Sequence, residues 1–184
     1  MKRSNWVMTI ERLKSILPAP LSTDVLEYSK WATVEAKLGT HLPEEYKEFV
    51  TLYGTGSIDD FLWVLNPFST NENLNLIKQS QIIGKAYIDL RNAFPKEYKH
   101  NIFPEENGLL VWAVTDNGDD IFWDTCGCPN SWKIVVYETR SSCYHEYQTT
   151  VTKFLHGILS RELYCDAFPG DFPSNNPVFV PIEQ

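Results

Sequence analysis

The stretch LLVWAVTDNGDDIFWDT (109–125) decides how the rest of the sequence is interpreted. Two apolar runs flank Asp-Asn-Gly-Asp, and Asn117-Gly118 supplies the positive φ that a tight turn between antiparallel strands needs. The run WKIVVYET (132–139) predicts the next strand, because it is rich in β-branched and aromatic residues. FLWVLNPF (61–68) predicts another strand, which Asn-Pro ends. Together these runs predict an antiparallel meander.

Helical periodicity surrounds the meander. Apolar residues recur at helical spacing in the segments 6–17, 26–38, 42–53, 74–94 and 149–163. Ser22 or Thr23 can cap the second of these helices, and Gly39 is a natural stop for it. Helices, then a meander, then a closing helix predict an α+β fold and not a doubly wound parallel sheet. The chain of 184 residues favours one domain, with an extended tail at 168–181 that is rich in Phe and Pro.

The segment LGTHLPEEYKEFVTLYGTG (38–56) predicts a short amphipathic helix. Pro43 suits the first helical position, where its missing N–H costs nothing, and Gly54 can take the positive φ that ends a helix. One face of this helix carries Leu42, Tyr46, Phe49, Val50 and Tyr53. The segment therefore predicts packing and no chemistry.

Charge and composition exclude several classes of protein. The net charge is −8, from 16 basic and 24 acidic residues, whereas a nucleic-acid-binding protein needs a basic surface to neutralise phosphates. The start of the chain (1–20) lacks the continuous apolar core of a secretory signal, and no window approaches the ~18 apolar residues of a membrane span. We therefore expect a cytoplasmic protein that binds neither nucleic acid nor membrane. Its cysteines, which we expect to be reduced, are Cys126, Cys128, Cys143 and Cys165.

The cysteines raise the question of a metal site. Cys126-x-Cys128 and Cys143-x-His145 could form a split zinc site if adjacent strands placed them together. Paired zinc ligands usually have two residues between them, however, and here each gap is one residue. No third group completes a nucleophilic triad with Cys143 and His145, and DNGDD lacks the Glu that closes a calcium loop. We therefore predict no metal, no cofactor and no catalytic residue.

Acidic residues concentrate in the half of the chain that forms the meander. Lys133 and Arg140 are the basic residues between Glu105 and Glu146, and eight acids oppose them there. Such a surface can attract a basic partner and raise its association rate. The candidate partner-binding residues are Asp59, Asp60, Asp116, Asp119, Asp120, Asp124, Trp123 and Glu138. Further aromatic candidates are Trp112, Trp132, Tyr137 and Tyr144, although the core is the better interpretation for any single Trp.

The order of these features resembles the SUKH superfamily. Its N-terminal signature is matched by Glu35, Leu38-Gly39, Leu42-Pro43, Tyr46, Gly54 and Gly56. Its first strand, central hairpin, next strand and closing helix are matched by residues 62–68, 112–123, 132–136 and 154–155. The resemblance covers roughly residues 25–163, and the departures from its pattern are the N-terminal helix, the long segment 70–108 and the Phe/Pro tail.

The resemblance implies a curved antiparallel sheet with helices packed around it, and a function without catalysis. Bacterial members of the superfamily mostly neutralise polymorphic toxins, often nucleases or deaminases, by binding the toxin domain inside the cell that makes it. The superfamily also includes yeast regulators of cell-wall synthesis. From the resemblance we expect an immunity protein whose partner is a cognate, basic toxin. The alternatives are a scaffold in wall synthesis or signalling and, third, a metal-dependent hydrolase.

Overall fold

The computed structural model describes residues 4–20 and 28–182, so the capping residue expected at Ser22 or Thr23 lies outside the described residues. The helices are α1 (Ser4–Ile16), α2 (Tyr28–Leu38), α3 (Glu44–Tyr53), α4 (Leu76–Ala93) and α5 (Val151–Leu159), with a 3₁₀ helix η1 (Pro129–Ser131). The strands are β1 (Gly56–Ile58), β2 (Leu62–Val64), β3 (Leu109–Thr115), β4 (Asp120–Asp124), β5 (Lys133–Glu138), β6 (Cys143–Tyr147) and β7 (Phe179–Pro181).

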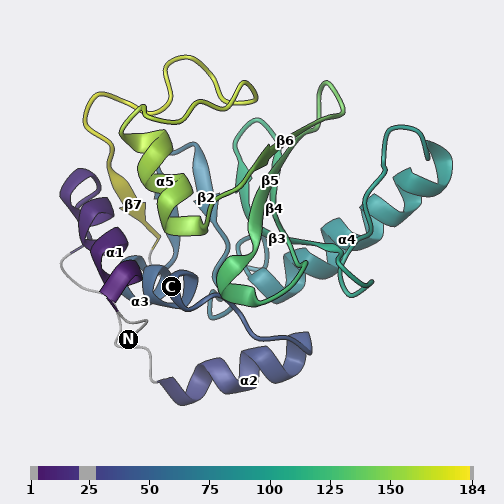
Figure 1. Cartoon of the computed structure of the whole chain (residues 1–184), viewed down its shortest axis with the longest axis horizontal. Helices are drawn as coiled ribbons and strands as arrows, with labels where there is room; N and C mark the ends of the chain where they lie inside the picture. Colours follow the sequence, from purple (N-terminus) through teal and green to yellow (C-terminus); the bar gives the residue numbers. More distant parts are fainter. Residues whose placement is uncertain (1–3, 21–27, 183–184) are drawn as a thin grey trace.

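The strands form one antiparallel sheet in the order β6-β5-β4-β3-β2-β1-β7 (Figure 1). This arrangement confirms the predicted α+β fold and the meander within it. The sheet is wider than the sequence predicted, because β1, β6 and β7 were not expected as strands. β6 has the sequence CYHEY, and none of its side chains is fully buried, so it lacks the apolar pattern that reveals a strand.

The hairpin of β3 and β4 forms where the sequence predicted it, with a different turn. The Thr115 C=O accepts a hydrogen bond from the Gly118 N–H at 3.0 Å, and the Thr115 N–H donates to the Asp119 C=O at 2.9 Å. The turn therefore has three residues, 116–118, with positive φ (85°) at Gly118 alone. Three-residue hairpin loops commonly need one such residue, and Gly adopts this conformation without a steric penalty.

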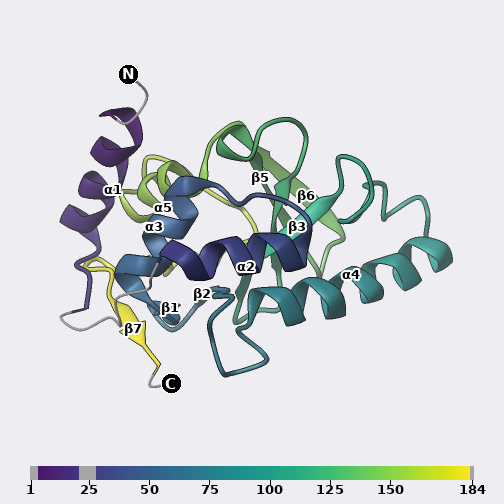
Figure 2. The same cartoon turned by 90° about the horizontal axis from the view of Figure 1, so that it is seen from below.

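The sheet is covered by helices on both faces. Successive side chains of a strand point to opposite faces, so Trp123 and Phe122 of β4 lie on different sides. The Trp123 ring lies 4.9 Å from the ring of Tyr46 in α3, whereas Phe122 lies 6.4 Å from Tyr87 in α4. Helix α5 covers the Trp123 side as well. Its Phe154 has its ring centroid 6.3 Å from that of Trp112, and Trp112 stacks on Trp123. The view from below shows α3 and α4 on opposite sides of the strands (Figure 2).

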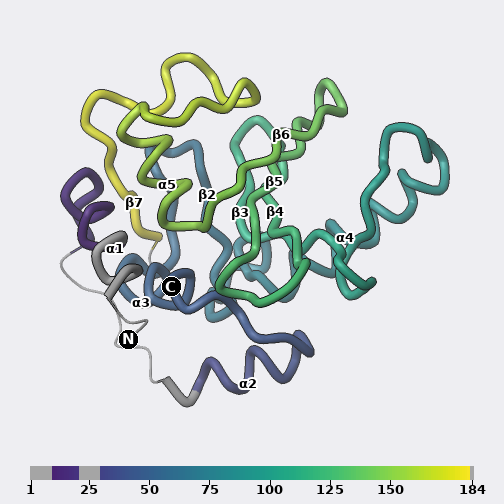
Figure 3. The backbone as a smooth tube through the Cα atoms, viewed as in Figure 1, coloured from purple at the N-terminus to yellow at the C-terminus, as the bar shows by residue number. Residues whose placement is uncertain are grey.

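The end of the C-terminal tail joins the sheet as a strand, whereas residues 166–176 run through turns and bends and are not extended as predicted. β7 pairs with β1 at the edge of the sheet, beside α3 (Figure 3). Its Phe179 ring lies 5.2 Å from that of Tyr53 and 6.2 Å from that of Phe49. A Cβ on Gly56 would lie 2.2 Å from the Val180 C=O, so the absence of a side chain there permits this close pairing.

Candidate partner-binding surface

Three turns of the meander lie together at one end of the sheet. They are the β1–β2 turn (59–61), the β3–β4 turn with the Asp119 that follows it (116–119) and the β5–β6 turn (139–142), in the upper part of Figure 1. The Asp116 N–H donates to the Phe61 C=O at 2.9 Å and joins the first two turns. The Thr139 hydroxyl donates to the Gly118 C=O at 2.6 Å and joins the second to the third. We use the name turn end for this region. It consists of the three turns, the flanking residues 120 and 138, and the segment 161–178, which packs on the turns.

Asp119 holds this region together and is not exposed to a partner. Its side chain accepts hydrogen bonds from the Thr115 hydroxyl at 2.9 Å and from the Thr139 N–H at 3.2 Å. Asp119 is only 1% exposed. The prediction that Asp119 contacts a partner is therefore wrong for this conformation, because its carboxylate is used within the fold.

The neighbouring carboxylates differ in exposure. Asp116 and Asp60 are exposed, and Asp60 accepts a hydrogen bond from the Ser57 hydroxyl at 3.3 Å. Asp120 is half-buried at the start of β4. Burial and, second to it, the nearby negative charge of Asp119 together raise the pKa of Asp120 to about 7. A basic side chain delivered by a partner would favour the ionised form of Asp120.

Asp59 connects the turn end to the tail. Its side chain accepts hydrogen bonds from the backbone N–H groups of Ser174 and Val178, each at 2.8 Å. The Asp59 N–H in turn donates to the Val178 C=O at 2.9 Å. Asp59 therefore fixes the position of the tail, and each of its carboxylate oxygens already accepts a hydrogen bond.

The structure does not bring all the predicted residues together. Trp123 is 0% exposed and packs against Trp112 and Tyr46, so its proposed role as a partner contact is wrong. Asp124 lies at the opposite end of β4 and accepts a hydrogen bond from the Cys126 N–H at 3.1 Å. The other aromatic candidates are also occupied by packing: Trp112, Trp132 and Tyr137 are buried, and Tyr144 is half-buried.

Glu138 does lie at the turn end, at the last position of β5. Hydrogen bonding by Ser141 and, secondarily, by His145 lowers the pKa of Glu138. The His145 Nε2 is 3.4 Å from the Glu138 carboxylate. Glu138 therefore stays ionised at neutral pH and contributes negative charge to this surface.

Sequence reasoning missed the contribution of the segment after α5. The ring of Phe61 in the β1–β2 turn packs against the rings of Phe168 and Phe172, with distances between ring centroids of 5.6 and 4.6 Å. This packing places residues 165–172 beside the turns, with Asp166 and Asp171 exposed. Tyr164, just before this packed segment, is 74% exposed and supplies the large aromatic surface that Trp123 does not. The Phe/Pro composition of the tail was visible in the sequence, but the surface against which it packs was not.

The cysteines do not form the split zinc site. Cys126 and Cys128 follow the end of β4, whereas Cys143 pairs with Glu138 at the turn end, so β5 separates the two pairs along its length. Within residues 4–20 and 28–182, no group of three or more His, Cys, Asp or Glu side chains is placed to hold a metal ion. Nor does any helix of those residues have the length and apolarity needed to cross a membrane.

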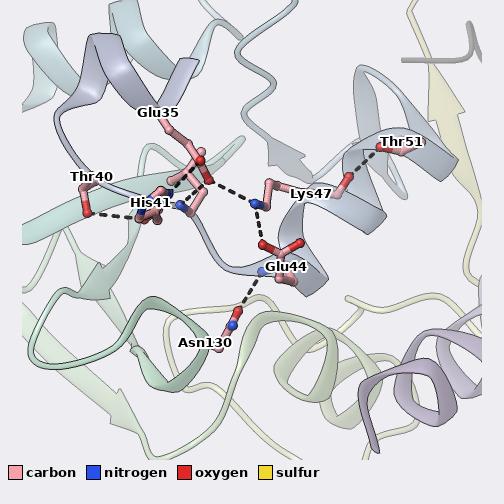
Figure 4. A network of polar contacts seen from close by, with 8 residues as sticks. Glu35, Thr40, His41, Glu44, Lys47, Thr51 and Asn130 are labelled. Carbon is pink, nitrogen blue, oxygen red and sulfur yellow. Dashed lines mark hydrogen bonds and ion pairs between the residues drawn. The ribbon is translucent and has the colours of Figure 1, made fainter. Parts of the chain in front are cut away.

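A second charged region surrounds Glu35, which together with Leu42 belongs to the N-terminal signature described above (Figure 4). Glu35 of α2 accepts hydrogen bonds from the Leu42 N–H at 2.9 Å and from Lys47 Nζ at 3.0 Å, and its second oxygen lies 2.8 Å from His41 Nδ1. Lys47 also pairs with Glu44 at 2.6 Å. We call these five residues the signature corner, because they fix the loop between α2 and α3.

The helix boundaries in this corner refine the prediction. Gly39 and Gly54 have φ values of 76° and 75°, as expected for residues that end α2 and α3. Pro43 precedes the first residue of α3, with ψ of 132°, and does not occupy the first helical position. The predicted apolar face, Leu42, Tyr46, Phe49, Val50 and Tyr53, is fully buried, which confirms its packing role.

Comparison with protein families agrees with this geometry. Residues 29–155 match the model of the SUKH_6 family, described as SMI1-KNR4 cell-wall. The match covers more than half of the chain, so the chain belongs to this family. A search of curated proteins and a search of solved structures found no significant match. Family membership is consistent with an immunity or regulatory role. Helix α1, the segment after α5 and β7 lie outside the matched residues.

Proposed function

We propose that this protein is a non-catalytic immunity protein, which binds and neutralises a cognate toxin domain with a basic surface in the cytoplasm. The observation that carries the proposal is the turn end. Exposed carboxylates from distant parts of the sequence converge there: Asp60, Asp116, Asp166 and Asp171. The basic side chains of the same region are Arg140 and Arg161, and the Arg161 guanidinium donates to the Pro173 C=O at 2.5 Å.

This arrangement suits a partner that normally binds nucleic acid. A nuclease or deaminase carries a basic cleft for phosphates, and an acidic protein surface can occupy that cleft and be steered to it electrostatically. Tyr164 offers an exposed ring beside the carboxylates, and aromatic side chains often dominate the energy of an interface. Burial of the cleft by this surface would inhibit the toxin without any chemistry by the immunity protein.

The test is binding to the toxin domain that is encoded nearest to the gene. The variant Asp60→Lys/Asp116→Lys reverses two exposed charges without touching the buried Asp119. We expect a loss of affinity of roughly 100-fold and a weaker salt dependence, measured by calorimetry at several ionic strengths. The matched control Asp89→Lys/Glu106→Lys makes the same change of charge at exposed positions outside the turn end and should change the affinity by less than about threefold.

Two results would contradict the proposal. If the wild-type protein forms no complex with that toxin domain, the immunity function is wrong. If the wild type binds and both double variants weaken binding equally, the turn end is not the contact surface and the effect is one of overall charge.

The alternative function is a regulatory scaffold in cell-wall synthesis or signalling. The observation that favours it is the cell-wall description of the matched family. The fold would be the same, and the gene neighbourhood distinguishes the two functions. A neighbouring gene for a large secreted protein with a variable C-terminal domain supports immunity, whereas a neighbouring operon for wall synthesis supports the scaffold.

A further inference from the structure

Cys126 and Cys128 form an exposed pair of free thiols that the proposed function does not use. They flank Gly127 in the loop between β4 and η1, at the end of the sheet opposite to the turn end. We propose that this Cys-Gly-Cys loop is a redox site. Its thiols exchange with low-molecular-weight disulfides, such as oxidised glutathione, and form a reversible disulfide with each other.

The backbone geometry brings the two thiols within reach. Residues two apart in sequence have Cα atoms at most about 7 Å apart, because each step spans about 3.8 Å. A disulfide needs a Cα separation of about 4.4–6.8 Å, so an extended chain is at the edge of this range and a bend brings it inside. The chain bends at Gly127, which has a φ of 84°. No side chain atom crowds this residue, since the nearest atom to a Cβ built there would be the Ser131 hydroxyl at 3.9 Å.

The loop is anchored on both sides of the bend. The Cys126 N–H donates to the Asp124 carboxylate at 3.1 Å, and the Cys128 C=O accepts from the Ser131 N–H at 2.8 Å. The Asn130 side chain accepts from the Glu44 N–H at 2.8 Å and connects the loop to the start of α3. These contacts fix the backbone on both sides of the bend and reduce the conformational entropy that a disulfide would otherwise remove.

The exchange balances in two steps. The thiolate of one cysteine attacks a sulfur of the small disulfide, forms a mixed disulfide and releases one small thiolate. The second cysteine, as thiolate, then attacks the protein sulfur of the mixed disulfide, closes the Cys126–Cys128 bond and releases the second small thiolate. Two protein thiols are oxidised and one small disulfide is reduced to two thiols, which take up the two protons. The neighbouring thiol acts at high effective concentration, so the second step is faster than cleavage of the mixed disulfide by a small thiol.

The protein carries its own controls. Cys143 is also exposed but lies near the turn end, remote from the pair, so its mixed disulfide has no thiol to resolve it. Cys165 is buried, and burial raises the pKa of its thiol, which disfavours the reactive thiolate. Trp132 is a local reporter, because its indole N–H donates to the Gly127 C=O at 3.4 Å.

The experiment treats the full folded chain with oxidised glutathione, quenches with acid and maps the cysteines by mass spectrometry. We expect an internal disulfide without a glutathione adduct in the peptide that contains 126–128, and one glutathione on Cys143. The variants Cys126→Ser and Cys128→Ser should each retain a glutathione on the remaining cysteine of the pair. Alkylation of both cysteines in the wild type should fall about tenfold, and excess reduced glutathione should reverse the change.

Two outcomes would overturn the inference. One is a stable glutathione adduct on both Cys126 and Cys128 in the wild type, which would show that the thiols cannot reach each other. The other is free thiols at both positions while Cys143 is modified, which would show that the loop does not exchange. The fluorescence of wild type and of Cys126→Ser, compared before and after oxidation, separates closure of the loop from modification elsewhere.

Discussion

In the signature corner Lys47 lies buried between the carboxylates of Glu35 and Glu44, whereas at the turn end Asp60 and Asp116 project to solvent beside other carboxylates. Both regions are rich in charge. In the corner the charges are of opposite sign and hydrogen-bonded to one another. At the turn end the charges are mostly of one sign. Among the described residues, no basic side chain forms an ion pair with Asp60 or Asp116.

The pKa shifts of the two regions report the same contrast. In the corner, burial opposes ionisation of Glu35, but hydrogen bonds from the Leu42 N–H, His41 and Lys47 outweigh it and lower the pKa of Glu35. At the turn end, burial and the charge of Asp119 raise the pKa of Asp120. The corner thus stabilises its ionised groups, and the turn end destabilises one of its own. A carboxylate whose ionisation is opposed, as that of Asp120 is, gains most when a partner brings positive charge, so we interpret the corner as frame and the turn end as surface.

The largest effect is expected in the corner. Lys47→Met removes the cation from a buried ion pair and one of the hydrogen-bond donors to the Glu35 carboxylate, so the free energy of unfolding should fall by about 3 kcal/mol. Urea denaturation measures this loss. The double variant Glu35→Gln/Lys47→Met should lose less than the sum of the single variants, because it removes both charges together. A loss below about 1 kcal/mol for Lys47→Met would mean that the corner is not a frame.

The next effect is expected at Asp119, which belongs to the turn end by position and resembles the corner in its contacts. Asp119→Ala leaves the Thr139 N–H and the Thr115 hydroxyl without their acceptor, so it should lower the free energy of unfolding by about 2 kcal/mol. Thermal and urea unfolding test this expectation. If the variant has unchanged stability but binds the partner more weakly, Asp119 belongs to the contact surface after all.

Much of the frame could be predicted from the sequence because its signals are local. The helices α3, α4 and α5, the β3–β4 hairpin and the glycines that end α2 and α3 follow from periodicity and turn chemistry over a few residues. The family signature also has a local cause, since Glu35 and Leu42 close one loop.

The surface could be predicted only in part, because it depends on contacts between distant residues. Asp59 and Val178 are 119 positions apart, and nothing in either stretch indicates that they meet. Strand alternation places Trp123 on one face of β4, but the sequence does not say which face the helices cover. The structure places Asp60 near Asp116, but Trp123 is packed in the core, Asp119 is buried and Asp124 lies at the other end of β4, which the sequence had no means to reveal.

A smaller effect, dependent on pH, is expected for Asp120→Asn. In the wild type the pKa of Asp120 is raised from 3.8 to about 7 on folding, so the folded state retains a proton that the unfolded state has lost between these values. The contribution of Asp120 to the free energy of unfolding is therefore fully present below about pH 4, falls as the pH rises and stays low above pH 7. The Asn variant removes that loss and should be more stable by about 1 kcal/mol at pH 8, since partial exposure reduces the full effect of the shift.

The measurement for Asp120→Asn is urea unfolding of wild type and variant at pH 4 and pH 8. Their difference should be near zero at the lower pH and should favour the variant at the higher pH. An equal difference at both values would show that the amide acts through packing or hydrogen bonding and not through charge. A variant that is less stable at pH 8 would mean that Asp120 is already paired in the folded protein.

The smallest effect on stability should come from the variant with the largest expected effect on binding. Asp60→Lys/Asp116→Lys changes two exposed side chains, so its free energy of unfolding should differ from that of the wild type by less than about 0.5 kcal/mol. The substitutions relieve repulsion between carboxylates but remove the acceptor of the Ser57 hydroxyl, so the two contributions oppose each other, and the electrostatic gain should shrink as salt is added. Urea unfolding at low and high ionic strength tests the size of the change and its salt dependence. If this variant loses as much stability as Lys47→Met, the carboxylates of the turn end support the fold in the same way as those of the corner, and any loss of partner binding would follow from unfolding.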